Sequence, residues 1–383
     1  MIIRRWSIVG CTFLGLVMLS CITQANGQPR AAGTADANWE TMVAKATSFL
    51  RKAQADDGSF SKDKSIGITG VVMTGLIKCG QIDMQDPMIA KGMGFIEKLV
   101  DPQSGHIAGL NPRVQLKNYV TSVNVMALAA ANINGRYQTI VDRGAKFLTE
   151  LQWDEGENIN PSNNFYGGFG YDSKNRPDMS NSSMAMEALK AAGLPPTHPA
   201  FKRAIIFVSR AQNFKNEHQD QPWGGLINDG SFVYSPAGAG ETKANELPTG
   251  AKPGTASMTY AGVKSLIYAG VSKDDPRVKH ALAWIRNNYS LDENVGMGEG
   301  KRQFGLYYYY HTMAKCFDAL GVDEFEDAKG VKHDWRKELI EALAKRQKPD
   351  GSWINEQDRW MEGDPNLVTG YALMTLSYCK PKK

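Results

Sequence analysis

The sequence of 383 residues contains little cysteine, no C-x-x-C pair and no strong charge bias. Its 5 cysteines are too few for a disulfide scaffold and lack the spacing of a zinc site. Lysine and arginine number 44 against 40 acidic residues, and no basic run exceeds two residues. This balance excludes a basic nucleic-acid footprint, so no nucleic-acid partner is expected. A Gly-x-Ser-x-Gly elbow, a His-Glu-x-x-His pair and a glycine-rich phosphate loop are also absent, which excludes the enzyme classes that need them.

Long apolar runs are absent except at the N-terminus. Arg4 and Arg5 precede an apolar stretch over 7–22, which is followed by small residues. This order predicts a secretory signal peptide over 1–27 and an exported mature chain, in the periplasm or outside the cell. The stretch is shorter than the roughly 20 residues of a membrane span, but an uncleaved anchor and lipidation at Cys21 remain alternatives. No later run is long enough, so no transmembrane helix is expected in the mature chain.

Glycine is abundant, with 38 residues, and much of it belongs to a repeated pattern. The first copy reads Lys45-Ala46-x-x-Phe49-Leu50-x-x-x-Gln54-x-x-x-Gly58-x-Phe60. Partial copies follow at Lys91, Arg143, Arg203, Trp284 and Gln347. After each copy comes a second apolar stretch, in which a small–large pair stands six residues after Thr69, Thr121, Ser182, Thr259, Tyr310 and Thr369. Apolar spacing of three and four residues predicts helices, and Ser or Thr suits a helix N-terminus, so each copy predicts two helices.

Helix pairs of this kind cannot bury their apolar faces singly and must stack on one another. An open array would need polar caps at its two ends, but the first and last copies are the best-formed ones. A closed ring is therefore favoured. We therefore expect an all-α fold, an α6/α6 toroid over 28–383 with the second helices inside. Residues 213–256, rich in Gly, Pro and Asn, are expected to form an insertion loop at one mouth. Cys79 and Cys379 occupy the same register in the first and last copies, so closure of the ring would make them neighbours. Whether they form a disulfide is not decided by the sequence.

The pattern resembles the prenyltransferase and squalene oxidase repeat of squalene–hopene cyclases and of protein prenyltransferase β-subunits. The resemblance covers residues 39–379 and implies an α/α toroid. Triterpene cyclases of this kind have two toroidal domains, whereas this chain is long enough for one. They carry an Asp-x-Asp-Asp-Thr motif whose middle Asp protonates the isoprenoid, and Asp178-Met179-Ser180-Asn181-Ser182 stands in that register. Ser180 replaces the acid, and a hydroxyl cannot protonate an alkene, which leaves Asp178 as a catalytic candidate or a helix cap.

The resemblance to prenyltransferase β-subunits implies a zinc ion held by Asp, Cys and His. Tyr310-His311-Thr312 resembles the segment that carries the zinc histidine, but the partner segment 254–260 contains neither Asp nor Cys. No metal and no cofactor is therefore expected. His311 is instead expected to be a hydrogen-bonded histidine of the inner wall.

Aromatic residues gather at the predicted turns and inner-helix starts: Phe165, Tyr166, Phe169, Tyr171, Trp223, Phe232, Tyr234, Tyr260, 307–310 and Trp360. In a toroid these positions surround one mouth, where they either pack on the turns or line a ligand pocket. The pocket candidates are Ser180, Asn181, Trp223, Tyr260, Tyr310, His311 and Trp360.

The leading hypothesis is an exported binding module for an apolar, isoprenoid-like molecule, a glycan or a partner protein. The alternative is a divergent squalene-type cyclase or a lyase-like enzyme on the same toroid. An enclosed apolar cavity with a buried carboxylic acid would favour the cyclase, and an open polar bowl would favour the binding module.

Overall fold

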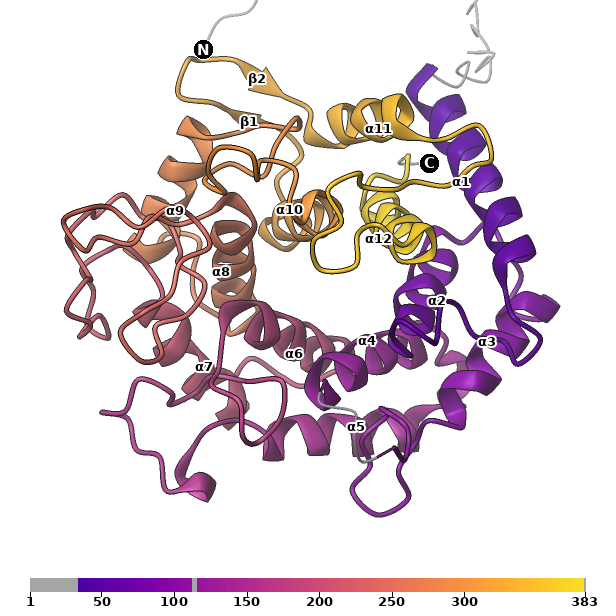
Figure 1. The fold of residues 1–383 in the computed structure, drawn as a ribbon, viewed down its shortest axis with the longest axis horizontal. Coiled ribbons are helices and arrows are strands. Elements are labelled where there is room, and N and C mark those ends of the chain that lie inside the picture. Colours follow the sequence, from indigo (N-terminus) through magenta and orange to yellow (C-terminus); the bar gives the residue numbers. More distant parts are fainter. Residues whose placement is uncertain (1–33, 112–115, 382–383) are drawn as a thin grey trace, which may run out of the picture.

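The structure is a computed structural model that describes residues 34–111 and 116–381. The predicted signal peptide over 1–27 and the lipidation candidate Cys21 lie outside these residues. In this part of the chain, twelve α-helices alternate between an outer and an inner layer (Figure 1). The outer helices are α1 (Thr34–Ala53), α3 (Pro87–Glu97), α5 (Gln138–Glu150), α7 (Pro199–Arg210), α9 (Pro276–Asn287) and α11 (Trp335–Arg346). The inner helices are α2 (Ile68–Cys79), α4 (Lys117–Ala130), α6 (Met179–Ala191), α8 (Ala256–Tyr268), α10 (Leu306–Leu320) and α12 (Pro365–Tyr378).

The remaining regular elements are short. They are two 3₁₀ turns and a two-stranded hairpin: η1 (Ile133–Gly135), η2 (Glu155–Glu157), β1 (Phe325–Glu326) and β2 (Lys332–His333). Strands β1 and β2 pair antiparallel. None of the described helices is long and apolar enough to cross a membrane.

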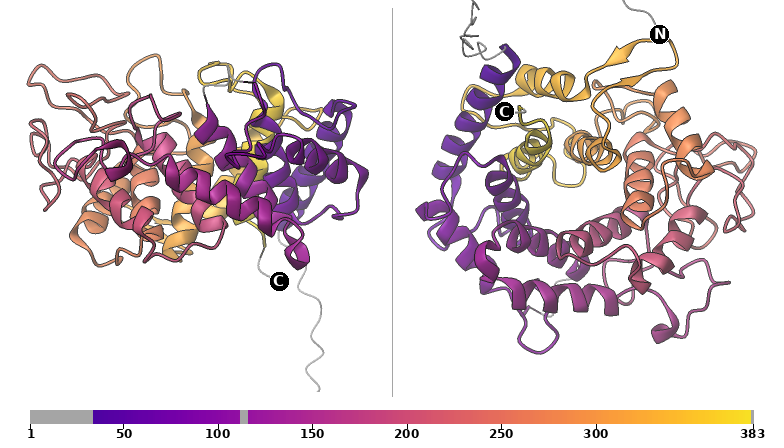
Figure 2. Two further views of the ribbon diagram at one scale, coloured as in Figure 1. Left: turned by 90° about the horizontal axis from the view of Figure 1, so that it is seen from below. Right: turned by 180° about the vertical axis from the view of Figure 1, so that it is seen from behind.

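The inner helices form a closed ring. Each packs against the next along the chain, and α12 packs against α2. Figure 1 shows α2 and α12 side by side, although they come from opposite ends of the described chain, and Figure 2 shows that the ring is flatter than it is wide. The α/α toroid predicted from the sequence is confirmed.

A glutamine just after four outer helices ties each turn to the next outer helix. Gln54 Nε2 donates hydrogen bonds to the carbonyls of Gly58 (3.1 Å) and Met88 (2.9 Å), the latter in the first turn of α3. The same pair of bonds joins Gln152 to Gly167 and Ala200, Gln212 to Gly230 and Arg277, and Gln347 to Gly351 and Met42. Gly58 has φ +89°, and a Cβ there would lie 2.2 Å from the Lys91 carbonyl oxygen, so the turn requires glycine.

The repeated hydroxyl residues lie near the starts of the inner helices, but they serve the preceding turn. Thr69 Oγ1 accepts a hydrogen bond from the backbone N–H of Phe60 at 3.0 Å. Equivalent bonds join Ile107 to Thr121, Phe169 to Ser182, Phe232 to Thr259 and Trp353 to Thr369. Five of the six inner helices are thereby fixed to the turns that lead into them, the exception being α10, which carries Tyr310 at this position. These bonds place the turn residues around one mouth of the ring.

Cys79 and Cys379 are buried at the ends of the adjacent helices α2 and α12, as closure required. Both are free thiols, so the disulfide that the sequence left open is not formed. The Cys79 thiol instead donates to the Leu373 carbonyl, with 3.3 Å between sulfur and oxygen. Burial raises the pKa of Cys79 to about 12 and keeps the thiol protonated.

Candidate functional site

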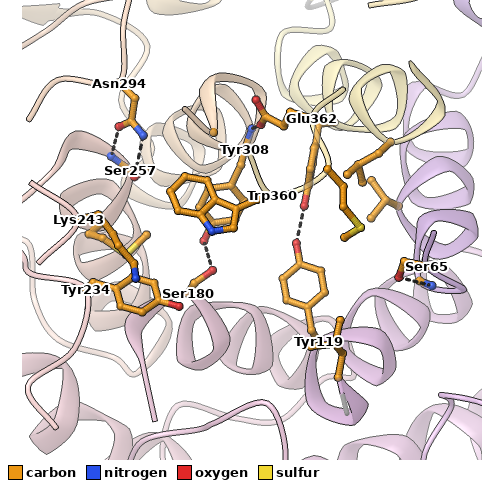
Figure 3. Close-up of a pocket in the computed structure, with 18 of the residues that line it drawn as sticks. Ser65, Tyr119, Ser180, Tyr234, Lys243, Ser257, Asn294, Tyr308, Trp360 and Glu362 are labelled. Carbon is orange, nitrogen blue, oxygen red and sulfur yellow. Dashed lines mark hydrogen bonds between the residues drawn. The ribbon is translucent and has the colours of Figure 1, made fainter. Parts of the chain in front are cut away.

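A cavity of about 180 Å³ opens where the inner helices begin (Figure 3). Ser180 reaches it from the first turn of α6, Ser257 from the first turn of α8 and Tyr308 from the first turn of α10. The turns that precede these helices complete the wall. The cavity therefore occupies the mouth at which the sequence placed its aromatic residues.

The wall of the cavity is mostly aromatic and aliphatic. Its aromatic members are Tyr119, Tyr171, Tyr234, Tyr308, Trp360 and Tyr371. Its aliphatic and thioether members are Ile68, Val71, Leu116, Met258, Met297, Met361 and Leu367. A concave wall of this composition suits an apolar ligand with a small number of polar groups.

Three of the tyrosine hydroxyls in the wall are paired with other protein groups. The hydroxyls of Tyr119 and Tyr371 share a short hydrogen bond, and Ser180 Oγ lies 3.4 Å from the Tyr308 hydroxyl. Burial raises the pKa of Tyr308 to about 12, so this hydroxyl is neutral near pH 7. Because these groups satisfy one another, they compete little for hydrogen bonds with a ligand.

Glu362 places a buried carboxyl group in this wall, on the turn between α11 and α12. Oε1 accepts hydrogen bonds from the backbone N–H groups of Tyr307 (3.1 Å) and Tyr308 (2.8 Å) at the N-terminus of α10. Oε2 accepts a hydrogen bond from Asn355 Nδ2 at 2.7 Å. Burial raises the pKa of Glu362 to about 7, while these donors act in the opposite direction. The group is therefore half protonated near neutral pH, which is the condition for a general acid or base.

Of the described residues that line the cavity, Lys243 is the one with a basic side chain. Its ammonium group lies 3.9 Å from the centre of the Tyr234 ring and forms a short ion pair with Glu241. Burial and the nearby Arg176 lower the pKa of Lys243. In Figure 3, Lys243 and Tyr234 lie at one end of the cavity, and Glu362 lies beyond Trp360.

Trp360 and Met361 line the cavity on a backbone that L-residues rarely adopt. Their φ values are +56° and +67°, a left-handed conformation that costs about 1 kcal/mol for each non-glycine residue. Gly305 faces the Trp360 ring, and a Cβ at that position would lie 3.2 Å from it. Such strain persists where surrounding contacts impose it, and it is concentrated at functional sites.

Ser180 and Trp360 are the two predicted pocket residues that line the cavity. Asp178 and Asn181 do not line it. Asp178 caps α6, with Oδ1 accepting from the Asn181 backbone N–H (2.8 Å) and Oδ2 from Asn181 Nδ2 (2.9 Å). Burial raises the pKa of Asp178, while its hydrogen bonds to Asn181 and to Tyr234, which lines the cavity, act in the opposite direction.

The other predicted aromatic residues pack elsewhere. Tyr260 contacts Tyr309 and Phe317, with ring centres 5.7 and 5.4 Å away. Tyr310 donates its hydroxyl to the Leu291 carbonyl, away from the cavity. Trp223 packs in the segment between α7 and α8, where a Cβ on Gly240 would lie 2.3 Å from its Nε1. These three rings contribute to the core and the turns instead.

His311 belongs to a buried charged cluster deeper in the ring, which we define as Glu187, Lys264, Lys315 and His311. Glu187 pairs with Lys264 at 2.6 Å and forms a short pair with Lys315. His311 Nε2 lies 3.4 Å from Glu187 Oε1. Burial lowers the pKa of His311 to about 4, so the ring is neutral at pH 7. In residues 34–111 and 116–381, no group of three His, Cys, Asp or Glu side chains is arranged to hold a metal ion.

The toroid is similar to solved structures of two enzyme types. A ligand-free variant of the type II terpene cyclase MstE from Scytonema matches with a TM-score of 0.54 and 13% identity, over 90% of this chain and 97% of that chain. A variant of it in complex with its substrate, geranylgeranyl dihydroxybenzoate, matches with a TM-score of 0.54 and 13% identity, over 91% of this chain and 99% of that chain. A D-mannose isomerase matches with a TM-score of 0.56 and 12% identity, over 92% of this chain and 98% of that chain. At these identities the likeness shows a shared fold.

No family model matches the chain, and no curated protein sequence matches it.

Proposed function

We propose that the protein binds an isoprenoid-like apolar molecule in the cavity at the inner-helix N-termini. The observation that carries this proposal is the predominantly aromatic and aliphatic wall, in which three tyrosine hydroxyls are already paired. A glycan fits this wall less well, because sugar hydroxyls need many hydrogen-bonding partners. Export of the chain, expected from residues 1–27, is part of the same proposal.

The test is direct binding of a neutral isoprenoid. Geranylgeraniol is titrated by calorimetry, and organic extracts of the purified protein are analysed by mass spectrometry for co-purified molecules. Ser180→Leu fills part of the cavity and is expected to weaken binding about 10-fold or more through steric exclusion. Ser272→Leu, an exposed position in the loop after α8, is the matched control and leaves binding unchanged. Equal binding by both variants would place the ligand elsewhere.

A second candidate function, acid-initiated cyclisation, is favoured by Glu362. Its neutral carboxyl donates a proton to a double bond of the bound chain, whose electron pair forms the new C–H bond. The aromatic faces of the wall stabilise the resulting cation, and the N-terminus of α10 stabilises the carboxylate. A second double bond of the chain donates its electron pair to this cation and forms the C–C bond of the ring. The new cation then loses a proton to water or to Glu362. The type II terpene cyclase MstE is matched, as a variant, over 97% of its length by this chain, so a chain of this length is compatible with terpene cyclisation without a second toroid.

The cyclase candidate is tested by incubation with geranylgeraniol and squalene, followed by gas chromatography with mass spectrometry. Cyclic products that disappear in Glu362→Gln but persist in Asp178→Asn would assign the acid to Glu362. Products lost in Asp178→Asn but retained in Glu362→Gln would return the assignment to the position that the sequence singled out. Binding without any cyclic product would contradict the cyclase candidate and support the binding function.

A further inference from the structure

The cation at one end of the cavity distinguishes it from a purely apolar pocket. Lys243 comes from the segment between α7 and α8, which leads into the first turn of α8. Its side chain is 26% exposed, so the ammonium group is partly withdrawn from solvent beside the Tyr234 ring. A partly desolvated ammonium group interacts more strongly with an anion than a solvated one does.

Lys243 shares the carboxylates around it with other groups. Glu241 is shared, because it pairs with Arg176 as well as with Lys243. The positive charge of Arg359 acts on Lys243 too, and the carboxylate of Asp178 acts with the opposite sign. Asp178 is itself hydrogen-bonded to the backbone and side chain of Asn181. Neither carboxylate is therefore available to Lys243 alone.

Lys243 also keeps hydrogen-bonding capacity. An ammonium group has three N–H donors. In the described chain, its hydrogen-bond partner is Glu241, and the Tyr234 ring covers one side of the group. Donors remain for a further acceptor that enters from the cavity.

We propose that Lys243 binds the anionic head group of an amphipathic ligand, a carboxylate or a phosphate, whose apolar chain occupies the aromatic wall. This inference rests on the proposed function and adds the chemical class of the ligand head. The head lies beside Lys243 and Tyr234, and the chain extends past Trp360 toward Tyr119, which lies on the opposite side in Figure 3.

The test compares three ligands with the same chain: geranylgeraniol, geranylgeranoic acid and geranylgeranyl monophosphate. Calorimetry at low salt is expected to show the acid or the phosphate binding about 10-fold or more tightly than the alcohol, as for other charge-assisted hydrogen bonds. Lys243→Met abolishes that preference because it weakens the acid and the phosphate more than the alcohol, and Lys243→Arg retains it. Lys202→Met, at an exposed position of α7, is the control for loss of one surface charge.

The outcomes separate this inference from the proposed function. Equal affinity for the alcohol and both anions overturns the anion site while the apolar cavity stands. A Lys243→Met variant that loses the alcohol and the anions in the same proportion also overturns it, because the side chain then acts by packing. Failure of all three ligands to bind the wild-type protein overturns the proposed function together with this inference. Thermal unfolding of each variant confirms that it is folded.

Discussion

The side-chain amide of Gln347 donates a hydrogen bond of 3.0 Å to the backbone carbonyl of Met42, across a sequence separation of 305 positions. The same amide nitrogen donates to the Gly351 carbonyl, also at 3.0 Å. Gln54, Gln152 and Gln212 make the equivalent pair of bonds, each to its own turn and to the next outer helix along the chain. The last turn thus binds the first outer helix as if α1 were the next repeat, and the outer layer closes by the same contact that builds it.

Replacement of Gln347 by methionine is expected to lower the free energy of unfolding by about 2 to 3 kcal/mol. The side chain keeps its length, but two carbonyl groups lose a donor in a partly buried turn. Urea denaturation followed by circular dichroism measures the change. Gln138→Met, on the exposed surface of α5, is the control and should have little effect. Equal stability of the two variants would show that the closing bond does not matter for the fold.

Gly75 is expected to be essential for the inner closure between α2 and α12. A Cβ at Gly75 would lie 2.7 Å from Leu373 Cβ and 2.9 Å from the Gly370 carbonyl oxygen. Gly75→Ala therefore overpacks the contact and should cost about 1 to 3 kcal/mol of stability. Gly94→Ala is the matched control, because a Cβ there meets nothing within 4 Å. It should raise stability by about 0.5 to 1 kcal/mol through helix propensity, so the two changes have opposite signs.

Glu187 is expected to hold the buried charged cluster together. Its side chain and that of Lys264 are 0% and 1% exposed. Although burial opposes ionisation, the two lysines hold the pKa of Glu187 well below its usual value. Glu187→Gln leaves two buried ammonium groups without their carboxylate and should lower the free energy of unfolding by about 3 to 5 kcal/mol.

Rescue by a second substitution separates charge from packing in this cluster. Adding Lys264→Met to Glu187→Gln removes one uncompensated cation, so the double variant should be more stable than Glu187→Gln alone. The surface pair Lys146–Glu150 serves as control, with side chains 74% and 60% exposed. Glu150→Gln should cause no measurable change. A double variant less stable than the single one would contradict the charge explanation.

The toroid was predictable because its signals are local and repeated. The hydrogen bonds of each turn require a Gln, a Gly and a following hydroxyl residue at fixed distances along the chain. This fixed spacing is visible as a repeated pattern in the sequence. The side chains that face the cavity were harder to predict. Tyr310 was selected, but Tyr308 lines the cavity, since two residues along a helix turn a side chain by about 200°. The aromatic run 307–310 indicated which end of α10 lies at the cavity, but it did not indicate which face of the helix points into the cavity.

Glu362 and Lys243 left no comparable signal in the sequence. Both stand in irregular turns, where an acidic or basic residue is usually solvated. Glu362 is buried because Asn355 and the first N–H groups of α10 surround it, and those groups are 7 and more than 50 positions away. Burial of this kind depends on the packing of the turn before α12 against the start of α10, which no short spacing encodes.

The stability of the protein should depend on pH through Glu362. The pKa of this group is about 7 in the folded chain and about 4.3 in an unfolded one, so the folded state binds the extra proton between these values. Its contribution is fully present below pH 4 and is lost as the pH rises through 7. Between pH 5 and 8 this loss amounts to about 2 to 3 kcal/mol. Burial lowers the pKa of His311 to about 4, which gives the opposite slope below pH 6.5, so the wild-type curve alone does not isolate Glu362.

Comparison with Glu362→Gln isolates the contribution of Glu362, because His311 and the other groups are common to both proteins. Urea unfolding at half-unit steps from pH 5 to 8 should give a difference in unfolding free energy that changes by about 2 to 3 kcal/mol across the range. The wild-type protein should be relatively more stable at the acidic end. A constant difference would show that Glu362 is ionised throughout, and it would then lack the proton that acid-initiated chemistry in the cavity requires.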